Sequence, residues 1–305
     1  MNFRTDMAYE SVLTNQKDPN IKIKESKHNF GIKRFDVDIL NIQGSKNFGK
    51  PKGKYITIEA KDFYQKEPDF LHYVAKMISQ AVIDCIGRSK HDAVLVVGLG
   101  NRHMTADSLG PNAVDNLIIT RHMDNEQDDA MITSSLCALS PGVLGITGIE
   151  TYDIIKGVAE KVNPDIIITV DALASRSTHR LSSAFQVTDT GIVPGAGVGN
   201  HRFKLSYDTL GIPVISIGIP LVVYASTLTL DIIDQIFSKT PELIPKDEQQ
   251  NKLVSNIISS SIGELVVTPK DIDAIVEKCA YVVGVAINLA VHQNLELDEI
   301  VGLIH

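Results

Sequence analysis

Two aspartates follow buried apolar runs in this chain, and their side chains could work together as an acid–base pair. Asp107 lies shortly after the run 93–97, and Asp171 follows the run 166–170 directly. Short valine- and isoleucine-rich runs are typical of parallel strands covered on both faces, and such strands place their carboxyl ends at one edge of a sheet. Two carboxylates in one cleft can share a proton, so that one activates water while the other protonates a leaving group. The pair therefore indicates hydrolytic chemistry.

Both aspartates also have structural explanations. Ser108-Leu109-Gly110-Pro111 is typical of a helix start, so Asp107 could be an N-cap. Asp171 could be a strand-end residue bonded to nearby amides. These positions alone do not separate capping from catalysis.

Glycines cluster after the first run and again at 191–200. A residue without Cβ lets other groups approach the main chain closely, which suits a loop that lines a cleft. The first cluster lacks the third glycine of a dinucleotide-binding fingerprint. We therefore interpret it as a loop whose main chain a peptide substrate can approach closely. The residues expected to line the substrate cleft or to donate to an oxyanion are Gly98, Gly100, Asn101, Glu150, Gly195, Gly197 and Gly199.

Apolar runs alternate with helical patterns along most of the chain, which predicts an α/β fold with a mostly parallel sheet and helices on both faces. The predicted strands include 93–97, 166–170 and 213–217, and the predicted helices include 71–86, 149–162 and 269–292. The segment at about 15–54 is polar and glycine-punctuated, so we expect loops there with one half-exposed strand near 35–39.

Composition excludes several classes of protein. The 305 residues carry a net charge of -8, and no basic run of the kind that tracks nucleic-acid phosphates stands out after the N-terminal region. The sequence predicts no run long and uncharged enough to span a bilayer, so no membrane contact is expected.

Cysteine and histidine usage gives no sign of a metal or a cofactor. The three cysteines, Cys85, Cys137 and Cys279, are far apart and odd in number, which indicates a reducing, cytoplasmic setting. The histidines lack the spacing of metal ligands.

The stretch from Gly98-Leu-Gly-Asn101 to Asp107-Ser-Leu-Gly110 resembles the germination proteases of spore-forming bacteria, which degrade small acid-soluble spore proteins. Further segments resemble that family in the same order along the chain. They are 138–151, 170–176, 189–200, 209–214 and 266–270. The resemblance thus covers nearly the whole chain, and several long segments in order are far more specific than one glycine motif.

The resemblance implies an endopeptidase of an atypical aspartic type whose two essential aspartates map onto Asp107 and Asp171. It implies a fold similar to hydrogenase maturation proteases, with N-terminal additions. It also implies a homotetramer in the cytoplasm of the forespore and spore core, with spore proteins as substrates and no cofactor.

Self-processing is a further implication of the resemblance. The family cuts after an acidic and before an apolar residue, and Arg4-Thr-Asp-Met-Ala8 resembles its processing site. The predicted bond joins Asp6 to Met7, so residues 1–6 would be a propeptide and 7–305 a single peptidase domain.

One departure and two alternatives stand beside this interpretation. The family pattern carries an aspartate where this chain has Tyr224, and that change is unexplained. A non-proteolytic protein could instead cradle a phosphate or nucleoside in its glycine loops. A metal-dependent maturation protease could use Asp107 with a histidine or Glu150.

Overall fold

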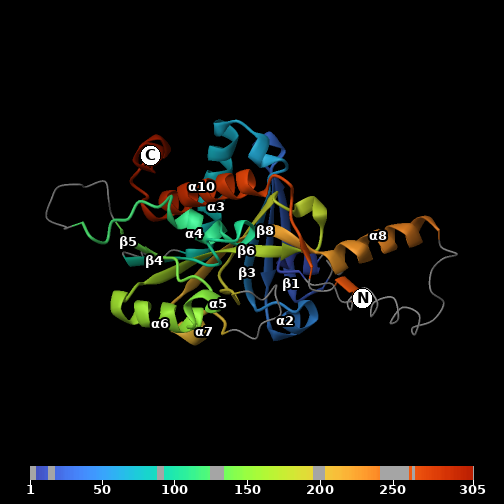
Figure 1. The fold of residues 1–305 in the computed structure, drawn as a ribbon, viewed down its shortest axis with the longest axis horizontal. Coiled ribbons are helices and arrows are strands. Elements are labelled where there is room, and N and C mark those ends of the chain that lie inside the picture. The colour runs from blue at the N-terminus through green and yellow to red at the C-terminus, as the bar shows by residue number, and fades with distance from the viewer. Residues whose placement is uncertain are drawn as a thin grey trace.

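The computed structural model describes residues 5–12, 18–87, 93–123, 134–194, 203–240, 261–262 and 265–304. Within them the chain forms a central sheet with helices packed on both faces (Figure 1), which confirms the predicted α/β class.

Strands and helices alternate along most of the described chain. In chain order, the strands are β1 (Ile21–Lys27), β2 (Lys33–Ile39), β3 (Gly53–Glu59), β4 (Ala93–Gly98), β5 (Ser135–Leu139), β6 (Ile166–Ser175), β7 (Ala184–Thr188), β8 (Val214–Tyr224) and β9 (Val266–Val267). The α-helices are α1 (Ala8–Val12), α2 (Ile42–Phe48), α3 (Pro68–Ile86), α4 (Leu109–Val114), α5 (Leu144–Thr147), α6 (Thr151–Val162), α7 (Tyr207–Leu210), α8 (Ala225–Lys239), α10 (Ile272–Val291) and α11 (Leu297–Ile304). Short 3-10 turns are η2 (Asn29–Gly31), η3 (Phe63–Gln65), η4 (Thr105–Asp107) and η5 (Thr178–Arg180).

The sheet has a parallel and an antiparallel half. Its strands run in the order β1-β2-β3-β7-β8-β6-β4-β5, and β9 pairs with β8. The neighbours β5, β4, β6 and β8 are parallel, as the alternation of strands and helices predicts. The strands β1, β2, β3 and β7 join antiparallel, and β7 also meets β8 antiparallel. The predicted parallel sheet is therefore one half of a larger mixed sheet.

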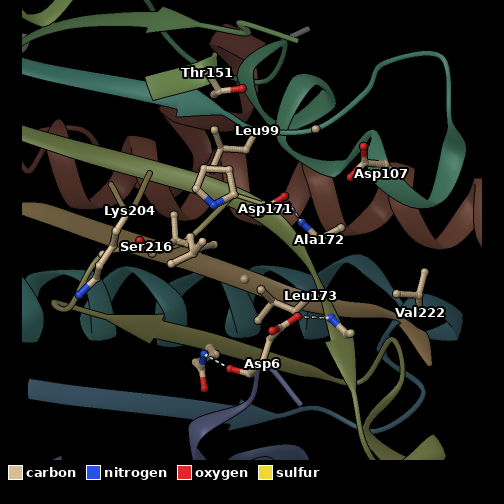
Figure 2. A pocket seen from close by; sticks show the side chains of 18 of the residues that line it. Asp6, Leu99, Asp107, Thr151, Asp171, Ala172, Leu173, Lys204, Ser216 and Val222 are labelled. Atoms are coloured by element: carbon tan, nitrogen blue, oxygen red, sulfur yellow. Dashed lines mark hydrogen bonds between the residues drawn. The ribbon is translucent and has the colours of Figure 1, made fainter. Parts of the chain in front are cut away.

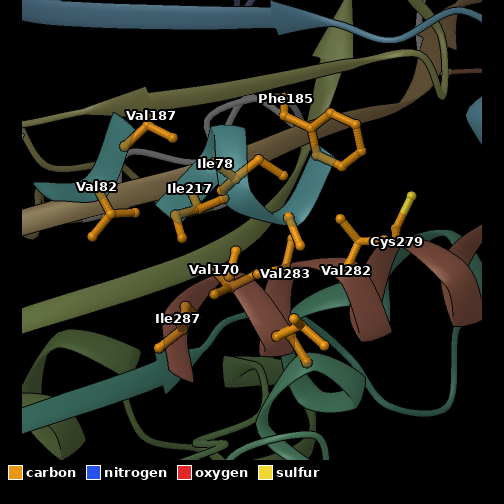
Figure 3. Close-up of a cluster of buried hydrophobic side chains, with 14 of the residues drawn as sticks. Ile78, Val82, Val170, Phe185, Val187, Ile217, Cys279, Val282, Val283 and Ile287 are labelled. Atoms are coloured by element: carbon orange, nitrogen blue, oxygen red, sulfur yellow. The ribbon is translucent and has the colours of Figure 1, made fainter. Parts of the chain in front are cut away.

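The helices α3 and α10 cover one face of the sheet and form the largest hydrophobic core with it. Figure 3 shows Ile78 of α3 and Val283 of α10 facing Val170 of β6 and Ile217 of β8. All four side chains are fully buried. Because a fully buried side chain of this size contributes about 1.5–3 kcal/mol, this layer is a main source of the fold's stability.

The helix α6 covers the opposite face (Figure 1). Leu95 and Val97 of β4 pack there with Ile155, whereas Val94 and Val96 join the core on the α3 and α10 side. Successive strand residues point to opposite faces, so both faces of β4 are apolar. This explains why its sequence is continuously hydrophobic.

The N-terminal segment holds more regular structure than its polarity suggests. The strand β2 is the half-exposed strand predicted near 35–39, whereas β1 and the helix α2 fall where loops are expected. In β1, Ile21 and Ile23 alternate with lysines, and Ile21 is buried. This is the two-residue period of a half-exposed strand, and here it marks the edge of the sheet.

The helix α10 corrects the expectation that no segment has the features of a membrane span. Its 20 residues are long and apolar enough to cross a bilayer by length and composition. In the structure most of the helix is buried, and it packs against α3, α4 and α11. A central core helix needs the same apolar composition, because it contacts protein on most of its circumference.

Main-chain packing between two glycines joins the start of α4 to the carboxyl end of β4. A Cβ on Gly98 would lie 2.2 Å from the carbonyl oxygen of Gly110. A Cβ on Gly110 would lie 2.4 Å from the Leu99 nitrogen and 2.5 Å from the Val170 oxygen. The Leu99 N–H donates to that same Val170 oxygen at 2.8 Å. The helix start therefore rests directly on the backbone of β4 and β6.

We expect Gly110→Ala to destabilise the protein by about 1–3 kcal/mol, because the added methyl group overpacks against main-chain atoms. Urea unfolding measures this loss. The control is Gly157→Ala in α6, where a Cβ would meet no heavy atom within 4 Å. A gain of about 0.5–1 kcal/mol is expected there from helix propensity. Equal stability of the two variants would contradict the packing argument.

Candidate active site

A cavity of about 660 Å³ lies over the carboxyl ends of the parallel strands, and both candidate aspartates line it. Figure 2 shows Asp171 on β6 and Asp107 on the chain segment that follows β4. The sequence predicts these two residues at one edge of the sheet. The structure brings them into one cavity.

Asp171 lies within β6 and does not end it, which corrects the predicted strand end. The strand continues through Ser175 because β8 pairs with it beyond this point. The neighbour on the other side, β4, ends at Gly98 opposite Val170. Asp171 is therefore the first residue of β6 beyond the end of β4. It is 5% exposed, and its carboxylate accepts from the Ala172 N–H at 2.9 Å.

Asp107 ends the 3-10 turn η4, and its carboxylate is held by the glycine loop. The Asn101 N–H donates to the carboxylate at 2.8 Å and to the Asp107 carbonyl oxygen at 3.1 Å. Gly100 makes this fold-back possible, since its φ is +109° and a Cβ there would lie 2.0 Å from that carbonyl oxygen. The N-cap position of α4 belongs to Ser108, which directly follows Asp107.

The N-terminal segment enters the same cavity. The Asp6 N–H donates to the Ala174 carbonyl at 3.0 Å, and the Asp6 carboxylate accepts from the Ala174 N–H at 2.8 Å. Asp6 also lines the cavity with Asp107 and Asp171. Figure 2 shows Asp6 beside β6, on the side of Leu173 that faces away from Asp171. The predicted processing bond thus begins at a residue that is bound to β6 and lines the same cavity as Asp107 and Asp171.

Two polar side chains hold the carbonyl group of that bond. Lys50 Nζ donates to the Asp6 carbonyl oxygen at 3.0 Å, and Gln186 Nε2 donates to it at 3.3 Å. Gln186 is paired with Gly218, and Gly218 is paired with Asp171, so the three residues lie on one rung across β7, β8 and β6. Residues on one rung project from the same face of a sheet, and the side chain of Leu173 packs over Gly218, where a Cβ would lie 2.4 Å from its Cδ1.

Comparison with known proteins identifies the family. The model of the germination protease family, peptidase family A25, matches residues 4–243. The chain belongs to the germination protease family. Among the relatives, the germination protease of Caldanaerobacter subterraneus subsp. tengcongensis is 41% identical, over 100% of this chain and 99% of its own length. Those of Clostridium tetani and Priestia megaterium are 38% and 36% identical, each over at least 97% of both chains.

Membership of the germination protease family makes the chain a protease and confirms the resemblance drawn from its motifs. A solved structure of the NiFe hydrogenase maturation protease HycI from Thermococcus kodakarensis is also similar. It is 18% identical, with a TM-score of 0.28, and the match covers 45% of this chain and 78% of that chain.

The other residues predicted for the germination protease cleft fall in different places. Gly100 and Asn101 line the cavity, whereas Gly98 and Glu150 are absent from its lining among the described residues. Gly98 packs against Gly110, and Glu150 is the N-cap residue of α6. The predicted Gly195, Gly197 and Gly199 lie outside the described residues.

Tyr224, where the resemblance implies an aspartate, lines the cavity as the last residue of β8. It is 3% exposed, so its ring fills part of the cavity wall. Within the described ranges, no group of three His, Cys, Asp or Glu side chains is gathered in a metal-binding arrangement. Nothing in the structure explains why tyrosine stands at this position.

Lys50 and Gln186 line the cavity and Glu10 anchors the N-terminal segment beside it, and none of these roles is predicted from the sequence. Lys50 follows a glycine in a polar stretch, and Gln186 sits inside a short strand, so neither has a local motif. Glu10 has one usable signal, since an acidic residue at an apolar helix start suggests a buried anchor. It is 3% exposed and accepts from the N–H groups of Arg176 at 2.9 Å and Ser177 at 3.1 Å.

We predict that the N-terminal segment is held more strongly as the pH falls. Burial raises the pKa of Asp6 above its ordinary value of 3.8, against the opposing effects of the Ala174 N–H and the Lys50 charge. The docked state therefore gains stability on protonation, and it loses this contribution as the pH rises through the raised pKa. Hydrogen exchange of the α1 amides at mildly acidic and neutral pH measures it. In intact Asp6→Asn protein this trend should vanish, and an identical trend in both proteins would contradict it.

Proposed function

We propose that this protease is a self-processing endopeptidase in which Asp107 and Asp171 act as the acid–base pair. The observation that carries the proposal is the shared cavity, because both carboxylates line it together with Asp6, the first residue of the predicted processing bond. A buried carboxylate and a half-buried one in the same cavity as a bound peptide segment are suited to water-mediated peptide hydrolysis.

The chemistry of the pair proceeds in two proton transfers. One carboxylate takes a proton from water as the water oxygen adds to the Asp6 carbonyl carbon, and the carbonyl electrons move onto its oxygen. The second group, in its acid form, gives a proton to the Met7 nitrogen as the carbon–nitrogen bond breaks. The products are a new carboxylic acid group on Asp6 and an amine on Met7, which then exchange one proton to give a carboxylate and an ammonium, and the shared proton has moved between the two aspartates.

The protein substrates we propose are small acid-soluble spore proteins, cut after an acidic and before an apolar residue. Asp6 and Met7 have the same character, since Asp6 makes polar contacts with Ala174 and Met7 packs against Leu173 and Ala184. We place the enzyme in the cytoplasm of the forespore and spore core, as a homotetramer made in a precursor form. Its relatives are named germination proteases, which agrees with action on proteins of the spore.

Asp107→Asn and Asp171→Asn should each abolish self-processing and peptide cleavage, because the amide can neither take up nor release the transferred proton. The loss should reach at least two orders of magnitude in kcat, with little change in the unfolding midpoint. Intact mass over time after purification measures it. The matched control is Asp153→Asn on the exposed face of α6, which should process at the wild-type rate. Wild-type processing by Asp171→Asn would refute the pair.

The processed chain should begin at Met7. N-terminal sequencing and the mass of the released fragment check this, since Thr5 and Asp6 contact the cavity while Met7 is fully buried in the body of the protein. A stable product that begins elsewhere would contradict the predicted bond.

Incubation with a chelator separates this chemistry from a metal-dependent maturation protease, because only the latter would lose activity.

A further inference from the structure

The strand β6 extends past the end of β4, which leaves part of its edge without a neighbouring strand among the described residues. In a parallel pair, every second residue turns its main-chain groups toward the same neighbour. The Val170 carbonyl accepts from the Leu99 N–H at 2.8 Å, so Val170 is turned toward β4. The Ile167 N–H donates to the Pro213 carbonyl at 2.9 Å, so Ile167 is turned toward β8. Ala172, two residues after Val170, therefore has its main-chain groups on the side of β4, beyond the end of that strand.

The residues that would continue the ladder opposite Ala172 are directed elsewhere. The Asn101 N–H donates to Asp107, to the carboxylate at 2.8 Å and to the carbonyl oxygen at 3.1 Å. The Leu99 carbonyl oxygen faces the start of α4, since a Cβ on Gly110 would lie 2.3 Å from it. The ladder thus ends one rung early, and Ala172 is half-buried in the lining of the cavity.

The carbonyl group of Ala172 is the acceptor that this arrangement leaves available. The Ala172 N–H donates to the Asp171 carboxylate at 2.9 Å (Figure 2). Within the described ranges, no group outside the sheet donates to the Ala172 carbonyl oxygen. A main-chain carbonyl that is shielded from water needs a hydrogen-bond partner, and the N–H of an extended peptide supplies one.

The same edge binds main chain two residues further along β6. The Ala174 carbonyl accepts from the Asp6 N–H at 3.0 Å, and the Ala174 N–H donates to the Asp6 carboxylate at 2.8 Å. Asp6 is far from β6 in the sequence, so this edge accepts a segment that is not part of the β4 ladder. Ala172 lies between the positions bound by Leu99 and by Asp6.

We propose that a peptide substrate is positioned by strand addition at this edge, with one of its main-chain N–H groups donating to the Ala172 carbonyl oxygen. This rests on the proposed function and specifies how its substrate is placed. Asp171 precedes Ala172 directly, so a main chain bound there passes beside one carboxylate of the pair. Main-chain contacts give affinity without regard to side chains, so Ala172 positions any extended peptide and leaves the choice of sequence to other parts of the cavity.

Peptides in which one amide is replaced by an ester test this contact, because an ester has no N–H to donate. The parent peptide is Met-Asn-Phe-Arg-Thr-Asp-Met-Ala-Tyr-Glu, the first ten residues of the chain. Each variant carries a single ester at a bond other than Asp-Met, and mass analysis follows cleavage of the Asp-Met bond. The enzyme is wild-type protein that has completed self-processing, and kcat and KM are measured separately.

One ester should lower kcat/KM by about fivefold, as expected for the loss of one neutral hydrogen bond. Successive N–H groups of an extended peptide point to opposite sides, so the esters at the two adjacent positions are the matched controls and should change kcat/KM less than about twofold.

Hydrogen exchange locates the contact on the protein. The probe is the parent peptide with its Asp-Met bond reduced to a methylene-amine, which cannot be hydrolysed. An excess of it should slow the exchange of amides in the segment 171–175. The amides of β1, the edge strand at the opposite end of the sheet, should not change. The same probe with the sensitive ester should protect the segment 171–175 less.

Uniform kcat/KM across the ester series, or protection of β1 without protection of the segment 171–175, would overturn strand addition at Ala172. The parent peptide separates this failure from failure of the proposed function. If wild-type protein does not cleave it, the proposed function fails. If the parent peptide is cleaved after its aspartate and the ester series is uniform, the placement of the substrate at Ala172 alone fails.

Discussion

Direct contact between main-chain segments at the end of β4 is the constraint on which the rest of the site depends. Gly98 and Gly110 leave no room for side chains, so the start of α4 rests on the backbone of Leu99 and Val170. Asp107 lies three residues before Gly110, and Asp171 follows Val170 directly. The same contact that ends the strand therefore brings the two carboxylates to one cavity. The loop between them then folds back through the Asn101 N–H and holds the Asp107 carboxylate.

The N-terminal segment binds to the part of β6 that extends past the end of β4. Ala174 binds Asp6 with both of its main-chain groups, while Glu10 and Met7 fasten the following residues to the protein. The segment thus has a removable part and a permanent part, divided at the predicted bond.

The sequence predicts β4, β6 and β8 of the parallel half, although not β5, and it predicts that Asp107 and Asp171 lie at one edge of the sheet. Continuous apolar runs identify β4 and β6 because both faces of these strands are covered, and the glycine loop marks the site. The antiparallel half is harder to predict, since β1 lies at the sheet edge and shows only alternate apolar residues among lysines. The full length of β6 also depends on β8, whose pairing no local pattern reveals.

The remaining site residues cannot be found from sequence for a physical reason. Lys50 and Gln186 reach Asp6 from positions 44 and 180 residues away along the chain. Their roles arise from the order of strands in the sheet, which places β7 beside β8, with Gln186 on the rung of Asp171. The glycine loops instead suggest oxyanion contacts from main-chain groups, yet one of those glycines, Gly98, serves only to let two backbones meet.

The central claim is that the aspartate pair activates water for cleavage between Asp6 and Met7. A single round of self-processing in water enriched in ¹⁸O tests it most directly, with mass analysis of the released fragment and of the peptides that contain Asp107 and Asp171. We predict one ¹⁸O atom in the new carboxylate of Asp6 and none in either aspartate side chain. Label in the side chain of Asp107 or Asp171 would show a covalent acyl intermediate and would contradict the claim.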